Sequence, residues 1–395
     1  MANVNLFTQP GTFRRMKPEF LCKWLEPTRD YLAGRGFVLP AGGNGSIDFE
    51  RLAGIFMEPD AAMPRDLMHS ASLIHEMSTE QAMHDLLDGI RHLQGKLDIG
   101  DDPDPVDVAV QVWLYAPEAL EEMHQMHQLE RPRGFVHFVT DRQPADGFDG
   151  PTEEQKAALE AELADWFHHA KRGRHAKVWM YRRPGEYWFL VRHGLASRRQ
   201  EVVSATGTDT LIFRPGEYDV LVYNRQSGEL RVHGCSPREV EMLRTSFGKH
   251  IFHDKDFFPG GARFTLAPLV ETGRGCLACR DVPGIEHITL TEVQAFTGGG
   301  EWLRTTFQAG DLFTNIENEK VVLPTAGYLV RASFLVRFSD SAKKRTIKIM
   351  GSNKLTVFRD GDTAMMDKWL VARGFVINRK ADEVKHENEE VLANA

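Results

Sequence analysis

Three polar side chains near the middle of the chain have types and a spacing that suit metal-dependent hydrolysis. Asp219 lies in the apolar run 218–223, and Glu229 and Arg231 follow on the next run after a turn. Metal-dependent nucleases place an Asp on one strand and a Glu-x-Lys on the next, so that two carboxylates hold Mg²⁺. Here arginine replaces the lysine, and a guanidinium stays protonated at ordinary pH. Asp219 and Glu229 are therefore candidate catalytic residues, with solvent-facing positions beside a hairpin turn as the alternative.

A histidine ends an apolar run a short distance upstream. The segment Leu190-Val191-Arg192-His193-Gly194 resembles the motif of the histidine phosphatase family, in which Arg-His-Gly ends a strand. The resemblance implies that His193 is the phosphate-accepting nucleophile, that Arg192 holds the phosphoryl oxygens and that His233 mimics the second histidine. It covers this one strand end, because mainly strands follow, whereas the family continues as alternating strands and helices. The alternative is a half-buried histidine at the end of a strand.

Residues 171–199 carry much more positive charge than the rest of the chain. They include nine basic side chains and one acidic one, for a net charge of +8 in a protein whose total is −8. Five aromatic residues are interspersed with them. Cations neutralise phosphates and rings stack on bases, which is the combination that binds nucleic acid. The predicted phosphate-contacting residues are Lys171, Arg172, Arg174, Lys177, Arg182, Arg183, Arg192, Arg198 and Arg199.

The alternative for this basic stretch is internal neutralisation. A hairpin surrounded by solvent can pair its cations with carboxylates of the acidic N-terminal region, where Asp101, Asp102, Asp104, Glu118, Glu121 and Glu122 are available. Phosphate contacts position a protein without reading a base sequence, so the pattern does not distinguish DNA from RNA. The stretch therefore predicts either a polyanion-binding surface or a charge-paired one.

Few other residue patterns in the sequence indicate a bound metal ion or cofactor. Cys276 and Cys279 form half of a zinc ribbon, but a structural zinc ion needs four ligands, so two buried thiols are the favoured interpretation. We find no phosphate-binding loop, no metalloprotease helix and no dinucleotide fingerprint. The sequence predicts no cofactor and no metal site, except Mg²⁺ under the nuclease alternative.

Composition indicates an ordinary globular protein. Of the 395 residues, 42% are apolar and 26% are charged. The sequence lacks an apolar run of about 20 residues, which a membrane helix requires, so we expect no membrane partner. Residues 1–13 lack a signal peptide pattern, and four cysteines in so long a chain do not form a disulfide framework, so we expect a cytoplasmic protein.

These residues are positioned by elements of two kinds, which predict an α+β fold. Apolar stripes at helical spacing predict a helical N-terminal domain, 1–143. A helix with a capping box of Thr152 and Gln155, a hairpin turning at Pro184-Gly185 and further strands predict a mixed antiparallel-sheet domain, 151–258. It ends with a helix whose capping box is formed by Ser236 and Glu239. Strand patterns and a closing helix at 362–373 predict a β-rich domain, 259–378. A charged tail, 379–395, ends the chain.

From these patterns we expect a non-catalytic subunit of a larger, bacterial-type assembly. It would contact nucleic acid or an acidic protein partner through the basic-aromatic hairpin 171–199. One alternative is the metal-dependent nuclease using Asp219 and Glu229. Another is a protein–protein scaffold that binds no nucleic acid.

Overall fold

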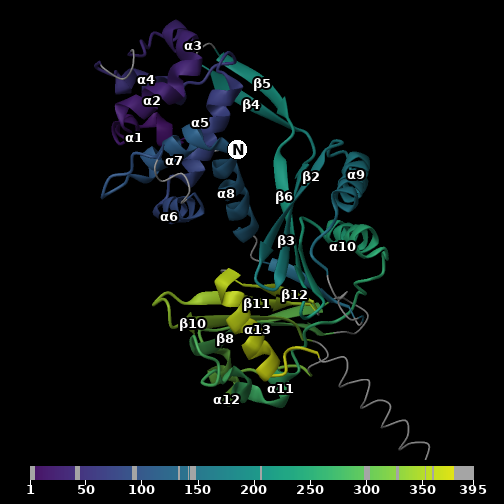
Figure 1. The fold of residues 1–395 in the computed structure, drawn as a ribbon. Coiled ribbons are helices and arrows are strands. Elements are labelled where there is room, and N and C mark those ends of the chain that lie inside the picture. Colours follow the sequence, from purple (N-terminus) through teal and green to yellow (C-terminus); the bar gives the residue numbers. More distant parts are fainter. Residues whose placement is uncertain are drawn as a thin grey trace, which may run out of the picture. The chain divides into compact units, whose positions relative to one another are not determined.

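The structure is a computed structural model whose described residues form two compact units. It describes residues 5–40, 45–90, 96–131, 134–140, 142, 148–204, 207–297, 303–325, 329–351, 353–357 and 360–377. The first unit is Met1–Gln128 with Leu195–Pro215, and the second is Leu129–Gly194 with Gly216–Ala395. Helices dominate the N-terminal part and an antiparallel sheet dominates the second unit, which confirms the α+β fold class (Figure 1).

The first unit is a bundle of short helices. Its elements are η1 (Asn5–Thr8), α1 (Pro10–Arg14), α2 (Pro18–Leu25), η2 (Glu26–Thr28), α3 (Arg29–Gly34), α4 (Phe49–Met57), α5 (Arg65–Met77), α6 (Glu80–Gly89), α7 (Pro105–Tyr115) and α8 (Pro117–Glu130). The ring of Phe7 lies at the centre of the core, with centroids 5.6, 5.3 and 5.4 Å from those of Phe13, Trp24 and Phe56. The indole N–H of Trp24 donates to Ser70 Oγ at 2.9 Å, so the polar atom of this buried ring has a partner.

Helix α7 is buried along most of its length. Its residues from Val106 to Val112 are all buried, as expected for a helix that is apolar around its whole circumference. Asp104 caps the helix by accepting from the N–H of Val106. Asp107 accepts from the backbone N–H of Lys17 at 2.7 Å and from the Gln111 amide at 2.9 Å, so its buried carboxylate is solvated by the protein.

The first unit also contains a two-stranded antiparallel ribbon, which we call the β4–β5 ribbon. It is formed by β4 (Arg198–Ser204) and β5 (Gly207–Phe213), and it is a sheet of its own within the described residues. The register pairs Arg199 with Ile212 and Val203 with Thr208. Val203 is 85% exposed and Ile212 is 72% exposed, so the ribbon presents apolar side chains to solvent.

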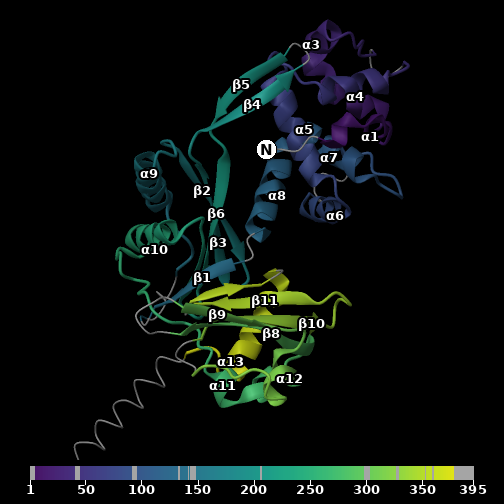
Figure 2. The same cartoon turned by 180° about the vertical axis from the view of Figure 1, so that it is seen from behind.

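The second unit is built on one antiparallel sheet of ten strands. Their spatial order is β2-β3-β6-β7-β1-β12-β11-β10-β8-β9. Figure 2 shows the sheet from behind. The strands are β1 (Gly134–Val139), β2 (Ala176–Arg183), β3 (Glu186–Gly194), β6 (Gly216–Asn224), β7 (Glu229–His233), β8 (Ile285–Thr297), β9 (Leu303–Gln308), β10 (Leu329–Phe338), β11 (Arg345–Met350) and β12 (Lys354–Thr356). The β2–β3 hairpin turns at the predicted Pro184-Gly185, where Gly185 has a φ of 76° that disfavours other residues.

Two long helices, α9 (Glu153–His169) and α10 (Pro237–Phe252), lie side by side on one face of β2, β3 and β6 (Figure 1). The predicted capping box of α9 is present, because Thr152 and Gln155 exchange both hydrogen bonds. The core on this face includes Leu159, Leu163, Phe167, Phe189, Val191, Leu221, Tyr223, Leu243 and Phe247. Alternate residues of these strands therefore face the two helices.

The C-terminal strands carry their helices on the opposite face of the sheet. Phe135 of β1 pairs with Leu355 of β12, and paired residues of antiparallel strands share a face. Phe135 packs on the face away from α9, and Leu355 packs in the C-terminal core with Phe334 and Trp369. The helices of this part are α11 (Pro268–Glu271), η5 (Gly273–Leu277), α12 (Leu312–Glu317), η7 (Asp360–Asp362) and α13 (Thr363–Ala372), the last at the predicted closing helix.

The compact units differ from the ranges predicted from the sequence. β1 lies in the predicted helical range 1–143 but belongs to the large sheet. That sheet also joins strands of the ranges 151–258 and 259–378, because β1 is paired on one side with β7 and on the other with β12. Residues 195–215 belong with the first unit. The tail 379–395 lies outside the described residues.

A search of the described helices for a membrane span gave a negative result: none combines the length and the apolar character needed to cross a bilayer.

Two neighbouring residues of α13 provide a test of the C-terminal core. Leu370 is fully buried and Val371 is 61% exposed. We expect Leu370→Ala to lower the free energy of unfolding by about 2–5 kcal/mol, because it opens a cavity. Val371→Ala, the control, should change it by less than about 0.5 kcal/mol. Urea unfolding followed by circular dichroism measures both, and equal effects would contradict this packing.

Candidate functional site

The basic stretch 171–199 is divided between the two compact units. β2 and β3 lie in the second unit, whereas Arg198 and Arg199 begin β4 of the first. Seven of the nine predicted phosphate-contacting residues therefore belong to one unit and two to the other. The single cationic hairpin expected from the sequence is thus two separate elements, the β2–β3 hairpin and the β4–β5 ribbon.

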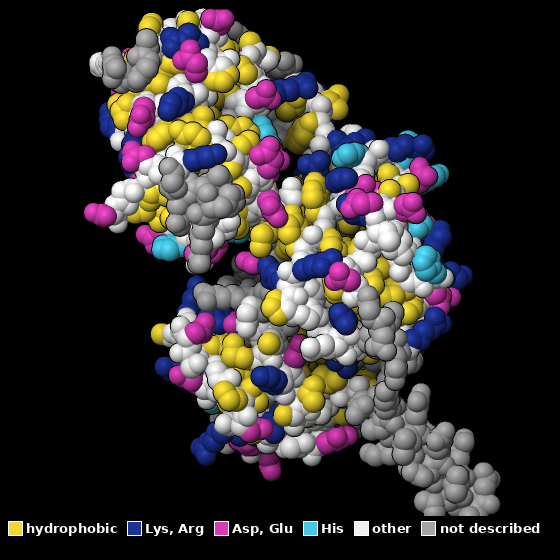
Figure 3. Space-filling model, viewed as in Figure 1, with side chains coloured by type: hydrophobic (Ala, Val, Ile, Leu, Met, Phe, Trp, Pro, Cys, Tyr) yellow, Lys and Arg dark blue, Asp and Glu magenta, His cyan; other side chains and the backbone are white. Residues whose placement is uncertain are grey.

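Five of the nine cations form ion pairs with carboxylates of the second unit. These pairs are Arg172–Glu239 at 2.8 Å, Arg174–Asp165 at 3.4 Å, Lys177–Glu160 at 3.1 Å, Arg182–Asp149 at 2.9 Å and Arg183–Glu130 at 2.8 Å. Lys and Arg side chains are interspersed with Asp and Glu side chains on the face that Figure 3 shows. None of these partners is one of the N-terminal acids considered above. Glu130 is the last residue of α8, and the final two residues of that helix belong to the second unit. The positive field available to a polyanion is therefore much smaller than the sequence count indicates.

The other cations are exposed. The Arg192 guanidinium lies over the Trp179 ring, 5.2 Å from its centroid, and Arg199 donates to Thr210 Oγ1 at 3.4 Å. Lys171 and Arg198 are exposed as well. Within the described part of the chain, Arg192, Arg198 and Arg199 form no ion pair.

The structure does not bring Asp219 and Glu229 together. Asp219 shares a face of β6 with Leu221, towards α9 and α10, whereas Glu229 shares the opposite face with Arg231. Glu229 is paired with Asn224, five positions along β6 from Asp219. At about 3.3 Å per residue this separates the two carboxylates far beyond the reach of one ion. The geometry therefore gives no support to a nuclease site that uses both.

Glu229 belongs instead to an ion-pair group on the other face of the sheet. Its Oε1 lies 2.8 Å from His137 Nδ1 and 3.2 Å from Arg263 Nε. Burial would raise the pKa of Glu229, but His137, Arg263 and Arg231 together lower it to about 2. Asp367 on α13 faces the same group, and burial raises the pKa of that carboxyl. Glu229 is thus held ionised by its neighbours, which is a structural role.

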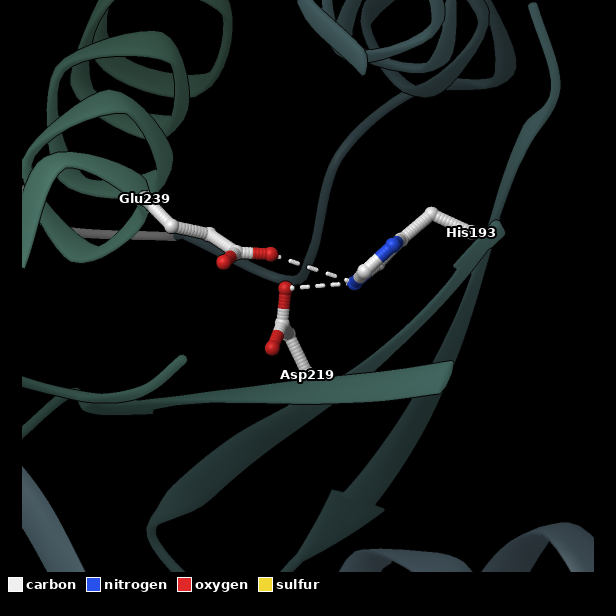
Figure 4. A group of neighbouring side chains, drawn as sticks. All are labelled: His193, Asp219 and Glu239. Atoms are coloured by element: carbon white, nitrogen blue, oxygen red, sulfur yellow. Dashed lines mark hydrogen bonds and ion pairs between the residues drawn. The ribbon is translucent and has the colours of Figure 1, made fainter. Parts of the chain in front are cut away.

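Asp219 belongs to a buried group with His193 and Glu239, which we call the His193 cluster (Figure 4). His193 ends β3, Asp219 is on β6 and Glu239 lies in the first turn of α10. His193 Nε2 is 3.0 Å from Asp219 Oδ2 and 3.2 Å from Glu239 Oε1. All three side chains are fully buried, and the Phe167 ring stacks on the imidazole with centroids 3.9 Å apart.

Charge and burial act against each other in this cluster. Burial and the Asp219 carboxylate raise the pKa of Glu239 to about 7, although Arg172 and His193 oppose the rise. Burial lowers the pKa of His193, but its hydrogen bond to Asp219 and the two carboxylate charges raise it above the usual value. Asp219 Oδ1 and Glu239 Oε2 are buried and have no hydrogen-bond partner. The cluster therefore contains two neighbouring groups, His193 and Glu239, whose pKa values are raised.

The phosphatase interpretation of the Leu190–Gly194 motif does not fit this geometry. Arg192 and His193 are consecutive strand residues, so they point to opposite faces, and Arg192 lies over Trp179 instead of beside the imidazole. His233 is on the face away from His193, and its Nδ1 bonds to the Gly134 carbonyl oxygen at 2.8 Å. A phosphoryl group could not contact all three side chains.

The cysteine pair is part of a core. Cys276 and Cys279 are 1% and 6% exposed, and both are free thiols that pack with the C-terminal core. Burial raises the pKa of Cys276 to about 12, so this thiol stays protonated.

No protein-family model matches this chain, and no curated protein is significantly similar to it.

Sequence reasoning missed the His193 cluster because it assigned each member to a different role. Glu239 completes a sequence capping box with Ser236, and the structure forms the bond from the Glu239 N–H to Ser236 Oγ. The Glu239 side chain instead reaches His193 and Arg172. The signal that was missed is the alternation of strand side chains between the two faces of the sheet. His193 and Asp219 lie two residues from Val191 and Leu221, so they point to the same face, into the core.

The Glu229 group predicts a dependence of stability on pH. A carboxyl whose folded-state pKa lies near 2 contributes stability above its unfolded value of 4.5, and that contribution is lost as pH falls towards 2. We expect Glu229→Gln to lower the free energy of unfolding by about 3 kcal/mol at neutral pH. The difference from the unmodified protein should shrink as pH falls below about 5.

Chemical denaturation at a series of pH values measures this difference. The control is Glu286→Gln, which removes an exposed ion pair with Arg337 of 2.7 Å. It should cost less than about 1 kcal/mol at any pH. A Glu229→Gln effect that stays constant down to about pH 2 would contradict the assigned ion pairs.

Proposed function

We propose that this protein is a non-catalytic subunit of a protein assembly and that the β4–β5 ribbon binds its partner. The observation that carries the proposal is the exposure of apolar side chains on a ribbon of two strands. Val203 and Ile212, 85% and 72% exposed, lie on the same face of it, and Leu211, 50% exposed, lies on the other. Two-stranded ribbons are marginally stable alone, and exposed apolar side chains mark surfaces of interaction.

The edge of β4 that is not paired with β5 indicates how a partner would bind. Within the described residues, β4 pairs only with β5, so the other edge of β4 has a row of backbone N–H and C=O groups without a strand partner. An open edge is a template for an added strand from another chain. The proposed contact is therefore strand addition along β4.

The partner that fits this edge is a second copy of the same chain. Arg199 and Glu201 are two residues apart on β4, so they share a face and carry opposite charges. Antiparallel pairing of β4 with its copy, centred on Gln200, places Arg199 opposite Glu201 of the partner subunit, and symmetry repeats this pair. Opposite charges directly across two strands stabilise their pairing.

A charge exchange tests this pairing. Arg199→Glu and Glu201→Arg each place two like-charged pairs across the interface, and each should weaken self-association about tenfold. The double variant restores both pairs of opposite charges, with the two signs exchanged. Its dimerisation constant should lie within about threefold of that of the unmodified protein. Analytical ultracentrifugation over a range of concentrations measures the dimerisation constant.

Two results would overturn the proposal. One is an unmodified protein that stays monomeric at every concentration, and the other is a double variant no better than the single ones. Glu153→Arg is the control for a general charge effect. Its side chain is 87% exposed and lies at the start of α9 in the second unit, so it should leave association unchanged.

Polyanion binding is a second candidate, favoured by Arg192. This exposed guanidinium lies over Trp179 and has no ion pair with a described residue, so it combines a cation with a ring. Few cations of the stretch 171–199 lie over a ring in this way, and any contact would be made by the face of the β2–β3 hairpin that carries Trp179 and Arg192.

Two arginines of that hairpin form a matched test. We expect a labelled single-stranded DNA 30-mer to bind with an affinity that falls steeply as salt rises. Arg192→Glu should weaken binding about fivefold. Arg182→Glu, at a position already paired with Asp149, should weaken it less than about twofold. Fluorescence anisotropy measures this, and no binding at low salt, or equal effects of both variants, would exclude this candidate.

A further inference from the structure

The His193 cluster has the ligand atoms of a metal site. Nε2 of His193, a carboxylate oxygen of Asp219 and a carboxylate oxygen of Glu239 all lie within 4.8 Å of one another. The two distances from Nε2 are 3.0 and 3.2 Å. Bonds of about 2.0–2.2 Å to a tetrahedral ion place its ligand atoms about 3.3 Å apart, so the three atoms need little movement to coordinate one. Figure 4 shows both carboxylates directed at the same ring nitrogen.

Unpartnered oxygens are a second and independent observation. Asp219 and Glu239 are both 0% exposed, and among the described residues Asp219 Oδ1 and Glu239 Oε2 have no hydrogen-bond partner. A buried carboxylate oxygen without a partner is costly, because its solvation by water is lost and nothing replaces it. Coordination of a cation by these two carboxylates compensates for that loss.

The orientation of the imidazole is suited to coordination. His193 Nδ1 lies 3.0 Å from the carbonyl oxygen of Gly194, so Nδ1–H donates there, and Nε2 is the nitrogen that can release its proton and coordinate an ion. The Phe167 ring, with an interplanar angle of 11°, fixes the plane of the imidazole. A lone pair that faces two carboxylate oxygens is repelled by them unless a proton or a metal ion lies between.

The charges of the site favour a divalent ion. Two carboxylates and a neutral imidazole carry a charge of −2, which a divalent ion neutralises. Arg172, 2.8 Å from Glu239 Oε1, orients that carboxylate from outside the ligand set. Imidazole with carboxylates is a ligand set for zinc-like ions, because Mg²⁺ and Ca²⁺ prefer oxygen alone.

A hollow of about 600 Å³ lies between the ends of α9 and α10. It is lined by Trp166, His169, Ala170, Pro237, Arg238 and Glu241. These include the chain neighbours of Phe167 and Glu239. We infer that His193, Asp219 and Glu239 bind one Zn²⁺ ion whose fourth ligand is a water molecule, as in zinc sites with three protein ligands, and that this binding ties α10 to strands β3 and β6.

The experiment is zinc titration of the full chain after treatment with EDTA. The background is Cys276→Ser with Cys279→Ser, so that the buried thiols cannot contribute. We expect one Zn²⁺ to bind with micromolar or tighter affinity in calorimetry, and the melting temperature to rise with added zinc. Asp219→Asn and Glu239→Gln should each weaken binding at least a hundredfold.

A buried histidine of the same sheet provides the matched control. His137 is 3% exposed and pairs with Glu229 on the opposite face, so His137→Gln should leave zinc affinity within about threefold. The proposal is overturned if the unmodified cluster binds no zinc below 100 μM, or if His137→Gln weakens binding as much as Asp219→Asn does.

A second measurement does not depend on how the Asp219 and Glu239 variants fold. Co²⁺ added to the same background should give the visible absorption of a tetrahedral site, and Zn²⁺ should abolish it by competition. Absence of that absorption would overturn the assignment. The site lies in the second unit and the β4–β5 ribbon in the first, so this result is independent of the assembly proposal.

Discussion

The second unit depends on balancing buried charge beneath α9 and α10. Asp219 and Glu239 are fully enclosed beside His193, and water cannot screen them there. Arg172 supplies a positive charge from the end of α9, and its contact with Glu239 attaches that helix end to the first turn of α10. One charge requirement therefore links α9, α10, β3 and β6. Replacing only one member would leave the others uncompensated, so the group must be kept or lost together.

The same requirement explains why the basic stretch is a poor guide to a ligand. A count of charges along the sequence treats Arg172 and Arg192 as equal. In the structure Arg172 points inward to a buried carboxylate, whereas the exposed Arg192 lies over the partly buried ring of Trp179. Lys177 illustrates a third role. Its partner Glu160 also accepts from the backbone N–H of Val178, and it thereby occupies part of the free edge of β2.

Local signals in the sequence predicted local structure well. The capping box at Thr152, the turn at Pro184-Gly185 and the closing helix at 362–373 all depend on residues close together in the chain. The candidate residues His193 and Asp219 were also named from the sequence. Their pairing with each other depends on strand register, which neighbouring residues do not encode. Glu239 was not recognised as a member of the His193 cluster, because a glutamate at this position can serve either in a helix cap or as a buried acid.

Strand β1 shows the same limit at the level of the whole sheet. Gly134–Val139 lies far along the sequence from both β7 and β12, yet it joins the two halves of the sheet. A strand of six residues carries little pattern of its own, and its place is decided by partners about 90 and 220 residues away in the chain. The sequence analysis considered each half of the sheet alone, so it did not include this link through β1.

The β4 edge poses the opposite problem, because open edges ordinarily associate without selectivity. Its sequence restricts the possible registers. Antiparallel self-pairing centred on Arg199 would oppose that side chain to Arg199 of the partner subunit. Centring on Glu201 would likewise oppose two carboxylates. Of these three neighbouring centres, only Gln200 pairs opposite charges and avoids like ones. The opposite charges of Arg199 and Glu201 thus disfavour the neighbouring registers. They can convert an aggregation-prone edge into one that accepts a defined partner in a defined register.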